Sequence, residues 1–257
     1  MNRIDHTSGQ SPTRVWGLSD FHLNYDSLPR ELTFVNSSNE PTWLKNARKI
    51  AKNWSECVGP NDIVLIPGDL SAAKTHSDVQ RDLAWLLKRP ASRVAISPGN
   101  HDHWFGRLAG VNRILRNNQL GIDGNAVDLG PLIVCGARST PTPDDPLSEP
   151  PRSGTAESIA FNKLQNALLE AQNLHPVNGP AKPIFVLWHH PPFDRWGRPD
   201  RVVELMRSFS VKACLYGHLH TQLQWQSAPQ GLIDGVEFYC VASDSLAFRP
   251  RLIADLS

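Results

Sequence analysis

Short apolar runs alternate with helical patterns along most of this chain of 257 residues. Seven of these runs are rich in Ile, Val and Leu and are bounded by glycine, proline or polar residues, which is typical of buried strands. The predicted strands are residues 14–19, 62–66, 93–97, 132–135, 184–188, 211–216 and 235–241. Strands that alternate with helices predict an α/β fold with a largely parallel sheet.

Five helical patterns fill the gaps between these strands. In residues 41–57 apolar side chains recur at helical spacing after a proline that suits a first turn. Residues 77–88 begin with a serine that we expect to cap the helix. The remaining predicted helices are residues 104–116, 156–173 and 201–208.

No stretch of the sequence resembles a linker between domains, so we expect residues 1–257 to form a single domain. Residues 139–154 are proline-rich, acidic and without periodicity, which predicts a long surface loop. We expect residues 139–180 to form a lid or loop insertion that covers the functional site.

The composition restricts the partners and the compartment. A formal net charge of +1 provides no long-range field to recruit nucleic acid or an anionic membrane. No run approaches the roughly 18–20 apolar residues of a membrane helix, and the polar first residues lack the apolar centre of a secretory signal. The four cysteines are far apart, and three lie in predicted strands, so we interpret them as small buried side chains in a reducing compartment. We therefore expect a soluble cytoplasmic protein with no membrane partner.

Five polar segments each follow one of the predicted strands directly. They are residues 19–22, 67–69, 99–102, 188–192 and 217–220. In open α/β sheets the carboxyl ends of strands meet at one crevice, so we expect these side chains to lie close together. Each segment alone also has a simpler interpretation, such as a turn at Gly68-Asp69 or a helix cap at Asn100. The five segments together, in this order, favour a functional site.

The donors in these segments are carboxylates, imidazoles and one amide, without a thiolate. Such donors suit divalent Mn, Fe, Zn, Ni or Co. Seven donors exceed what one tetrahedral site needs, and they suit two metals that share a carboxylate, for which Asp69 is the best candidate. Two metals about 3.5–4 Å apart can hold a water between them and clamp a phosphoryl group.

The order Asp20-x-His22, Gly68-Asp69, Gly99-Asn100-His101-Asp102, His189 and Gly217-His218-x-His220 resembles the calcineurin-like metallophosphoesterase superfamily. The resemblance extends from about residue 14 to 220. It implies an α/β fold of the four-layer α/β/β/α sandwich type, with two mixed sheets and a dinuclear metal site at the carboxyl ends of the strands.

The resemblance also implies residue roles. Asp20, His22 and His220 would hold the first metal, Asp69 would bridge, and Asn100, His189 and His218 would hold the second. His101, oriented by Asp102, would be catalytic, as the proton donor to the leaving group or by stabilising transition-state charge. His189 rather than His190 fits the position before the prolines, and His103 is left as a possible substrate contact.

The chain departs from two well-known branches of the superfamily. Leu70-Ser71-Ala72-Ala73 stands where the Ser/Thr protein phosphatases carry a phosphate-binding arginine, and the tyrosine ligand of purple acid phosphatases is missing near Asp69. The chain looks closest to uncharacterised bacterial-type predicted phosphohydrolases.

The expected function is therefore metal-dependent hydrolysis of a small phosphomonoester or phosphodiester by a metal-bridging hydroxide. Arg107, Arg138 and Arg195 are candidates for contacting the phosphate. A non-catalytic metal-binding scaffold on the same fold is one alternative, although all ligand positions are filled. A nuclease is another, and the absence of a basic stripe argues against it.

Overall fold

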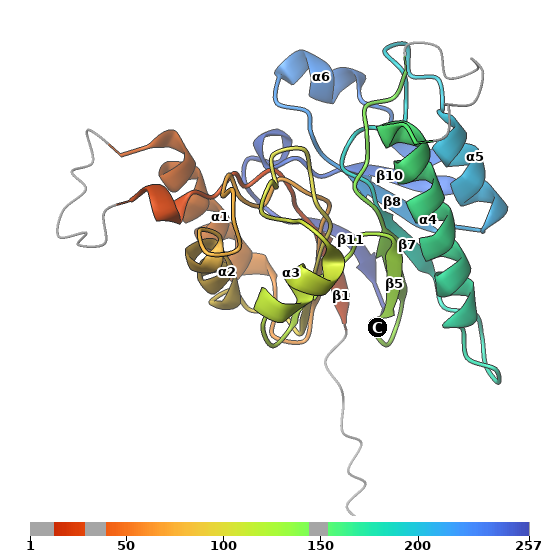
Figure 1. Ribbon diagram of the computed structural model, residues 1–257, viewed down its shortest axis with the longest axis horizontal. Helices are drawn as coiled ribbons and strands as arrows, with labels where there is room; N and C mark the ends of the chain where they lie inside the picture. The colour runs from red at the N-terminus through yellow and green to blue at the C-terminus, as the bar shows by residue number, and fades with distance from the viewer. Residues whose placement is uncertain (1–12, 29–39, 144–153, 257) are drawn as a thin grey trace, which may run out of the picture.

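The computed structural model describes residues 13–28, 40–143 and 154–256 as two mixed β-sheets packed face to face, with helices on both outer faces (Figure 1). Figure 1 shows α1, α2 and α3 on one side of the sheets and α4 and α5 on the other. The expected four-layer α/β/β/α sandwich is confirmed. Within the described residues, no helix is long and apolar enough to cross a membrane.

The first sheet has the strand order β11-β1-β2-β3-β4. Strands β1, β2, β3 and β4 run parallel to one another, and β11 pairs antiparallel with β1 at one edge. The strands are β1 (Arg14–Gly17), β2 (Ile63–Ile66), β3 (Arg93–Ile96), β4 (Gln119–Gly121) and β11 (Arg251–Asp255). The covering helices are α1 (Thr42–Cys57), α2 (Gln80–Leu87) and α3 (Leu108–Ile114).

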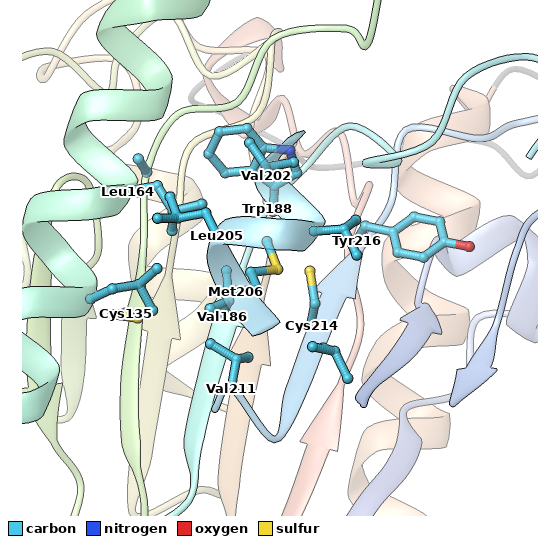
Figure 2. Packing of buried hydrophobic residues seen from close by; sticks show 14 of the residues in the cluster. Cys135, Leu164, Val186, Trp188, Val202, Leu205, Met206, Val211, Cys214 and Tyr216 are labelled. Carbon is cyan, nitrogen blue, oxygen red and sulfur yellow. The ribbon is translucent and has the colours of Figure 1, made fainter. Parts of the chain in front are cut away.

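The second sheet has the order β5-β6-β7-β8-β10-β9, with antiparallel strands at both edges of a parallel centre. The strands are β5 (Asn125–Asp128), β6 (Ile133–Gly136), β7 (Ile184–Leu187), β8 (Ala213–Tyr216), β10 (Val236–Cys240) and β9 (Gly231–Ile233). Helices α4 (Ala156–Asn173) and α5 (Arg201–Ser208) cover its outer face, and α6 (Gln222–Ser227) follows β8. Figure 2 shows this outer core, where Met206 of α5 lies over Val186 and Cys214 of the sheet.

The central strands are buried on both faces, which explains their continuous apolar sequences. In β2, Ile63 and Leu65 pack between the two sheets, whereas Val64 and Ile66 pack against the helices. The same alternation occurs in β7, where Phe185 faces the other sheet and Val186 faces α4 and α5. A shift of such a strand by one residue would move the side chains of each face into the opposite core, so the register is fixed. The positions of the strand ends are fixed by this packing.

The structure differs from the predicted elements mainly at edges and helix starts. Strands β4, β5, β9 and β11 were not predicted, because they are three to five residues long and most are partly exposed. Helix α2 begins at Gln80 rather than Ser77, since Thr75 and Asp78 exchange backbone-to-side-chain hydrogen bonds and form the preceding turn. Helix α3 begins at Leu108 rather than residue 104.

The segment expected to form a lid, residues 139–180, contains α4, which packs along β5 and β6 as part of the outer helical layer. The helical part of this segment therefore belongs to the fold itself. Residues 144–153 of the expected loop lie outside the described residues. That the whole chain forms one domain stays a prediction.

Candidate metal centre

The seven expected ligands lie just beyond the carboxyl ends of five strands, three from the first sheet and two from the second. Asp20 and His22 follow β1, Asp69 follows β2 and Asn100 follows β3. The imidazoles of the second sheet, His189, His218 and His220, follow β7 and β8. The structure brings these side chains together in two groups of four that share Asp69.

The first group consists of Asp20, His22, Asp69 and His220, whose donor atoms all lie within 4.8 Å of one another. His22 Nε2 is 3.8 Å from Asp69 Oδ2 and 3.4 Å from His220 Nε2, which is 3.6 Å from Asp20 Oδ1. Neighbouring ligands around a tetrahedral ion with bonds of about 2.1 Å are separated by about 3.4 Å. The spacing of the group therefore suits one metal ion.

The second group consists of Asp69, Asn100, His189 and His218. Asn100 Oδ1 lies 2.9 Å from His189 Nε2 and 3.0 Å from His218 Nδ1. His189 Nε2 is also 3.4 Å from Asp69 Oδ2. The 3.4 Å separation is that of ligands around a tetrahedral ion, and the two shorter contacts of Asn100 are hydrogen-bond distances that hold the three side chains together.

Asp69 joins the two groups through one oxygen. Its Oδ1 accepts a hydrogen bond from the backbone N–H of His101 at 2.8 Å. Its Oδ2 is buried and has no hydrogen-bond partner among the described residues. A buried carboxylate oxygen without a partner is costly, and two cations on either side would satisfy it. Burial alone would raise the pKa of Asp69, but the adjacent His189 lowers it, so the group is a carboxylate.

Two of the four histidines, His22 and His218, are prepared to act as neutral ligands, whereas the pKa of His189 is raised by Asp69 against the effect of burial and that of His220 is raised by Asp244. Burial lowers the pKa of His218 to about 4 and also lowers the pKa of His22. Neutral imidazoles present a lone pair to a metal. His189 Nδ1 lies 3.0 Å from the carbonyl oxygen of Pro67, to which it donates when Nε2 carries the lone pair. This contact directs His189 Nε2 to the second group.

Four expected ligands have a left-handed backbone. Asp20, His22, Asp69 and His218 have φ between 47° and 69°. Such conformations are uncommon for non-glycine residues and cluster at functional sites. Gly68 is also required here, because its φ is 112° and a β-carbon would lie 2.6 Å from His189 Nδ1.

The contacts of Asp102 favour a role other than the expected one. Its fully buried carboxylate accepts hydrogen bonds from the backbone N–H groups of Gly99, Leu70 and Ser71 and from Trp104 Nε1. These donors engage both oxygens, so Asp102 anchors the loop that carries Asn100 instead of orienting the His101 imidazole. The His101 side chain is exposed, and its ring centroid lies 5.3 Å from that of His22.

The guanidinium of Arg138, an expected phosphate contact, is bonded to backbone carbonyl groups. It donates to the carbonyl oxygens of Gly99, Asp102 and Phe105 at 2.6–3.0 Å. These bonds hold residues 99–105 as an irregular loop, which explains why α3 begins only after them. Arg107 and His103 are exposed near this loop.

His190 lies beside the second metal group and is bonded to Ser139. Its Nδ1 and its backbone N–H both lie 2.8 Å from Ser139 Oγ. Burial lowers the pKa of His190 to about 3, so the ring is neutral. It packs 4.3 Å, centroid to centroid, from the ring of His218.

Sequence reasoning missed Asp244. Its Oδ2 lies 2.7 Å from His220 Nδ1, and this hydrogen bond raises the pKa of His220. Asp244 follows β10 in the same way as the ligands follow their strands. Extending the strand-end argument to residues 235–241 would have indicated it.

A cavity of about 450 Å³ adjoins the segments that carry the second-sheet ligands. Its walls come from the loop after His189 and from the segment between Leu219 and Pro229, which includes α6. Arg195 lies in the wall with its guanidinium 4.1 Å from the ring centroid of Trp196. A volume of several hundred Å³ is common for small-molecule sites.

Two phage proteins are similar to part of the chain. The Gene 66 proteins of Mycobacterium phage D29 and Mycobacterium phage L5 are 31% and 30% identical to it over 90 residues. These matches cover 35% of this chain and 41% and 40% of the phage proteins, so the chain spans less than half of their length.

A solved structure of a protein of unknown function from Aquifex aeolicus is similar with a TM-score of 0.45 and 12% sequence identity. The similarity covers 93% of this chain and 95% of that chain. The family described as Calcineurin-like phosphoesterase matches residues 13–222, a range that contains all seven expected ligands. The chain therefore belongs to the calcineurin-like phosphoesterase family.

Proposed function

We propose that the chain is a dinuclear metal-dependent hydrolase of a small phosphate ester. The observation that carries the proposal is the four-donor group around the buried Oδ2 of Asp69, with Asn100, His189 and His218 as a second set of donors beside it. Asp20, His22 and His220 hold one divalent ion, Asn100, His189 and His218 hold the other, and Asp69 bridges them. When bound, two such ions lower the pKa of water and neutralise charge on phosphoryl oxygens.

The donor chemistry favours Mn, Fe, Zn, Ni or Co over Mg or Ca. Four of the seven ligands are imidazoles, and the remaining donors are carboxylate and amide oxygens. Mg²⁺ and Ca²⁺ prefer all-oxygen sites.

The cytoplasm stays the expected location of the protein.

His101 is the proposed proton donor to the leaving group. Its backbone N–H is bonded to Asp69, so the residue is fixed against the bridge while its side chain faces solvent. An imidazole there can reach a substrate that sits on the metals without being a ligand itself. Asp102 and Arg138 hold the backbone of His101 in this position through the loop contacts described above.

The cavity beside the second-sheet ligands can accommodate the organic part of the ester. Its walls combine apolar side chains such as Phe193 and Leu219 with Arg195. A walled cavity of this size favours a small molecule over a long nucleic acid, in agreement with the net charge of +1.

Metal removal and replacement test the proposal. Exhaustively chelated protein should lose hydrolysis of a panel of nitrophenyl monoesters, nitrophenyl diesters and cyclic nucleotides, and Mn²⁺ or Co²⁺ should restore it. His175→Gln makes the same exchange as His101→Gln but lies before β7, away from the carboxyl ends of the strands, so as the matched control it should retain full activity. Full turnover by metal-free protein would refute the proposal. Two bound metal equivalents without turnover on any substrate would indicate the non-catalytic scaffold instead.

A further inference from the structure

The imidazole of His220 lies between Asp244 and the first metal group. Its Nδ1 is 2.7 Å from Asp244 Oδ2, whereas its Nε2 is 3.6 Å from Asp20 Oδ1 and 3.4 Å from His22 Nε2. A carboxylate accepts but does not donate, so Nδ1 carries the proton in this contact. The lone pair of Nε2 then points at the first group.

Asp244 is itself held in place by the backbone of the site. It lies in the short 3-10 helix η2 (Ser243–Leu246), which follows β10. The Ser243 N–H donates to the carbonyl oxygen of Ser19 at 3.1 Å, and Ser243 Oγ donates to that of Asp20 at 2.9 Å. One turn therefore fixes both the Asp20 backbone and the Asp244 carboxylate.

We propose that Asp244 is a positioning residue of the first metal group, which fixes the tautomer and the ring orientation of His220. The inference rests on the proposed metal binding and adds a residue that lies outside the family match at residues 13–222. A carboxylate that receives the second N–H of a metal-bound histidine typically changes metal affinity 10–100-fold.

His220 depends on such a partner because its ring is exposed. The side chain retains 39% of its accessible surface, whereas His189 is fully buried and its Nδ1 is bonded to a backbone carbonyl. Packing restricts His189 from all sides. The ring of His220 has solvent on one side, so the hydrogen bond to Asp244 supplies the restriction that burial does not.

The test separates the two metal groups before Asp244 is changed. His189→Ala removes a ligand of the second group, so Co²⁺ titration of this variant measures the affinity of the first group. His22→Ala removes a ligand of the first group, so titration of that variant measures the affinity of the second. In the His189→Ala background, Asp244→Leu should weaken Co²⁺ binding about 10–100-fold and alter the Co²⁺ absorption spectrum. In the His22→Ala background the same change should leave Co²⁺ affinity unaltered. Asp244→Asn should restore most of the affinity, because its amide oxygen still accepts from Nδ1.

The control is Ser245→Ala, which removes a 2.7 Å hydrogen bond to the carbonyl oxygen of Ala242 within the same turn and leaves Asp244 in place. Equal loss of first-group affinity in Ser245→Ala and Asp244→Leu would overturn the inference, because the turn and not the carboxylate would then matter. Equal losses in both backgrounds would also overturn it. Failure of the unaltered protein to bind Co²⁺ would refute the proposed function itself.

Discussion

The substitution Asp102→Asn replaces one carboxylate oxygen of a buried side chain that accepts four hydrogen bonds. Oδ1 accepts from the N–H of Ser71 and from Trp104 Nε1, both at 2.9 Å. Oδ2 accepts from the N–H groups of Gly99 at 2.9 Å and Leu70 at 3.3 Å. An amide keeps one of the oxygens and presents an NH₂ group to the other two donors. Two buried N–H groups therefore lose their acceptor.

Each unsatisfied buried donor costs about 1–3 kcal/mol, so the free energy of unfolding should fall by roughly 4 kcal/mol. A decrease of this size is a large fraction of the roughly 5–15 kcal/mol of a typical domain. Urea denaturation of the chelated protein at neutral pH, followed by circular dichroism, measures it without a contribution from metals. Asp26→Asn makes the same exchange at an exposed position and should change the unfolding free energy little.

The same variant decides between two roles for Asp102. If Asp102 anchors the loop, Asp102→Asn should lower the stability of the fold and the metal affinity of the second group, which depends on Asn100. If Asp102 instead orients His101, Asp102→Asn should leave stability unchanged and lower kcat as His101→Gln does. A stability loss below about 1 kcal/mol together with that kcat effect would refute the argument from hydrogen bonds.

Four further substitutions test the bridging carboxylate, the proton donor and the pH dependence of stability. Asp69→Ala should weaken both metal groups because one carboxylate serves both, whereas His22→Ala should weaken mainly the first; elemental analysis that finds two equivalents retained in Asp69→Ala would contradict the bridge. His101→Gln should keep both metals and most activity on a nitrophenyl phosphate ester, but lose about 10²–10⁴-fold on an alkyl ester, whose leaving group needs a proton. Equal losses on both esters would favour stabilisation of the phosphoryl oxygens instead. Burial raises the pKa of Asp82 to about 6, so its contribution to stability is complete below the ordinary value of 3.8 and is lost as the pH rises through 6. Relative to Asp82→Asn, which does not titrate, the wild type should therefore lose roughly 3 kcal/mol between pH 3.8 and neutral pH, and a pH-independent difference in chelated protein would contradict this.

The grouping of the expected metal ligands could be predicted because it depends largely on a simple rule of the fold. Buried parallel strands are visible in the sequence, and polar residues at their carboxyl ends share one edge of the sheet. Asp69 after β2 and His189 after β7 are examples, and the structure brings their side chains within 3.4 Å. The rule explains the grouping within each sheet, whereas the approach of His189 to Asp69 also depends on how the two sheets pack.

The contacts around the ligands could not be predicted in the same way. Asp102 follows His101 directly in the sequence, which suggests that the two side chains are in contact. In the structure, the left-handed turn at Asp69 instead brings the N–H groups of Leu70 and Ser71 to the Asp102 carboxylate. Arg138 follows β6 of the other sheet and binds carbonyl groups of residues 99–105. Both contacts depend on tertiary placement, which no local pattern in the sequence records.

The two sheets share the work of building the proposed centre, and this explains where strain and support occur. Each metal group takes ligands from both sheets, so its geometry depends on how the carboxyl ends of the two sheets are held together. Four ligands have left-handed backbones, at a cost of about 1–3 kcal/mol each. The supporting contacts fall at the same places: Asp102 and Arg138 hold the loop of Asn100, and Ser243 holds Asp20. Changes to these supports should therefore lower stability and metal affinity together, whereas changes to the imidazole ligands should lower affinity with little effect on the stability of the metal-free fold.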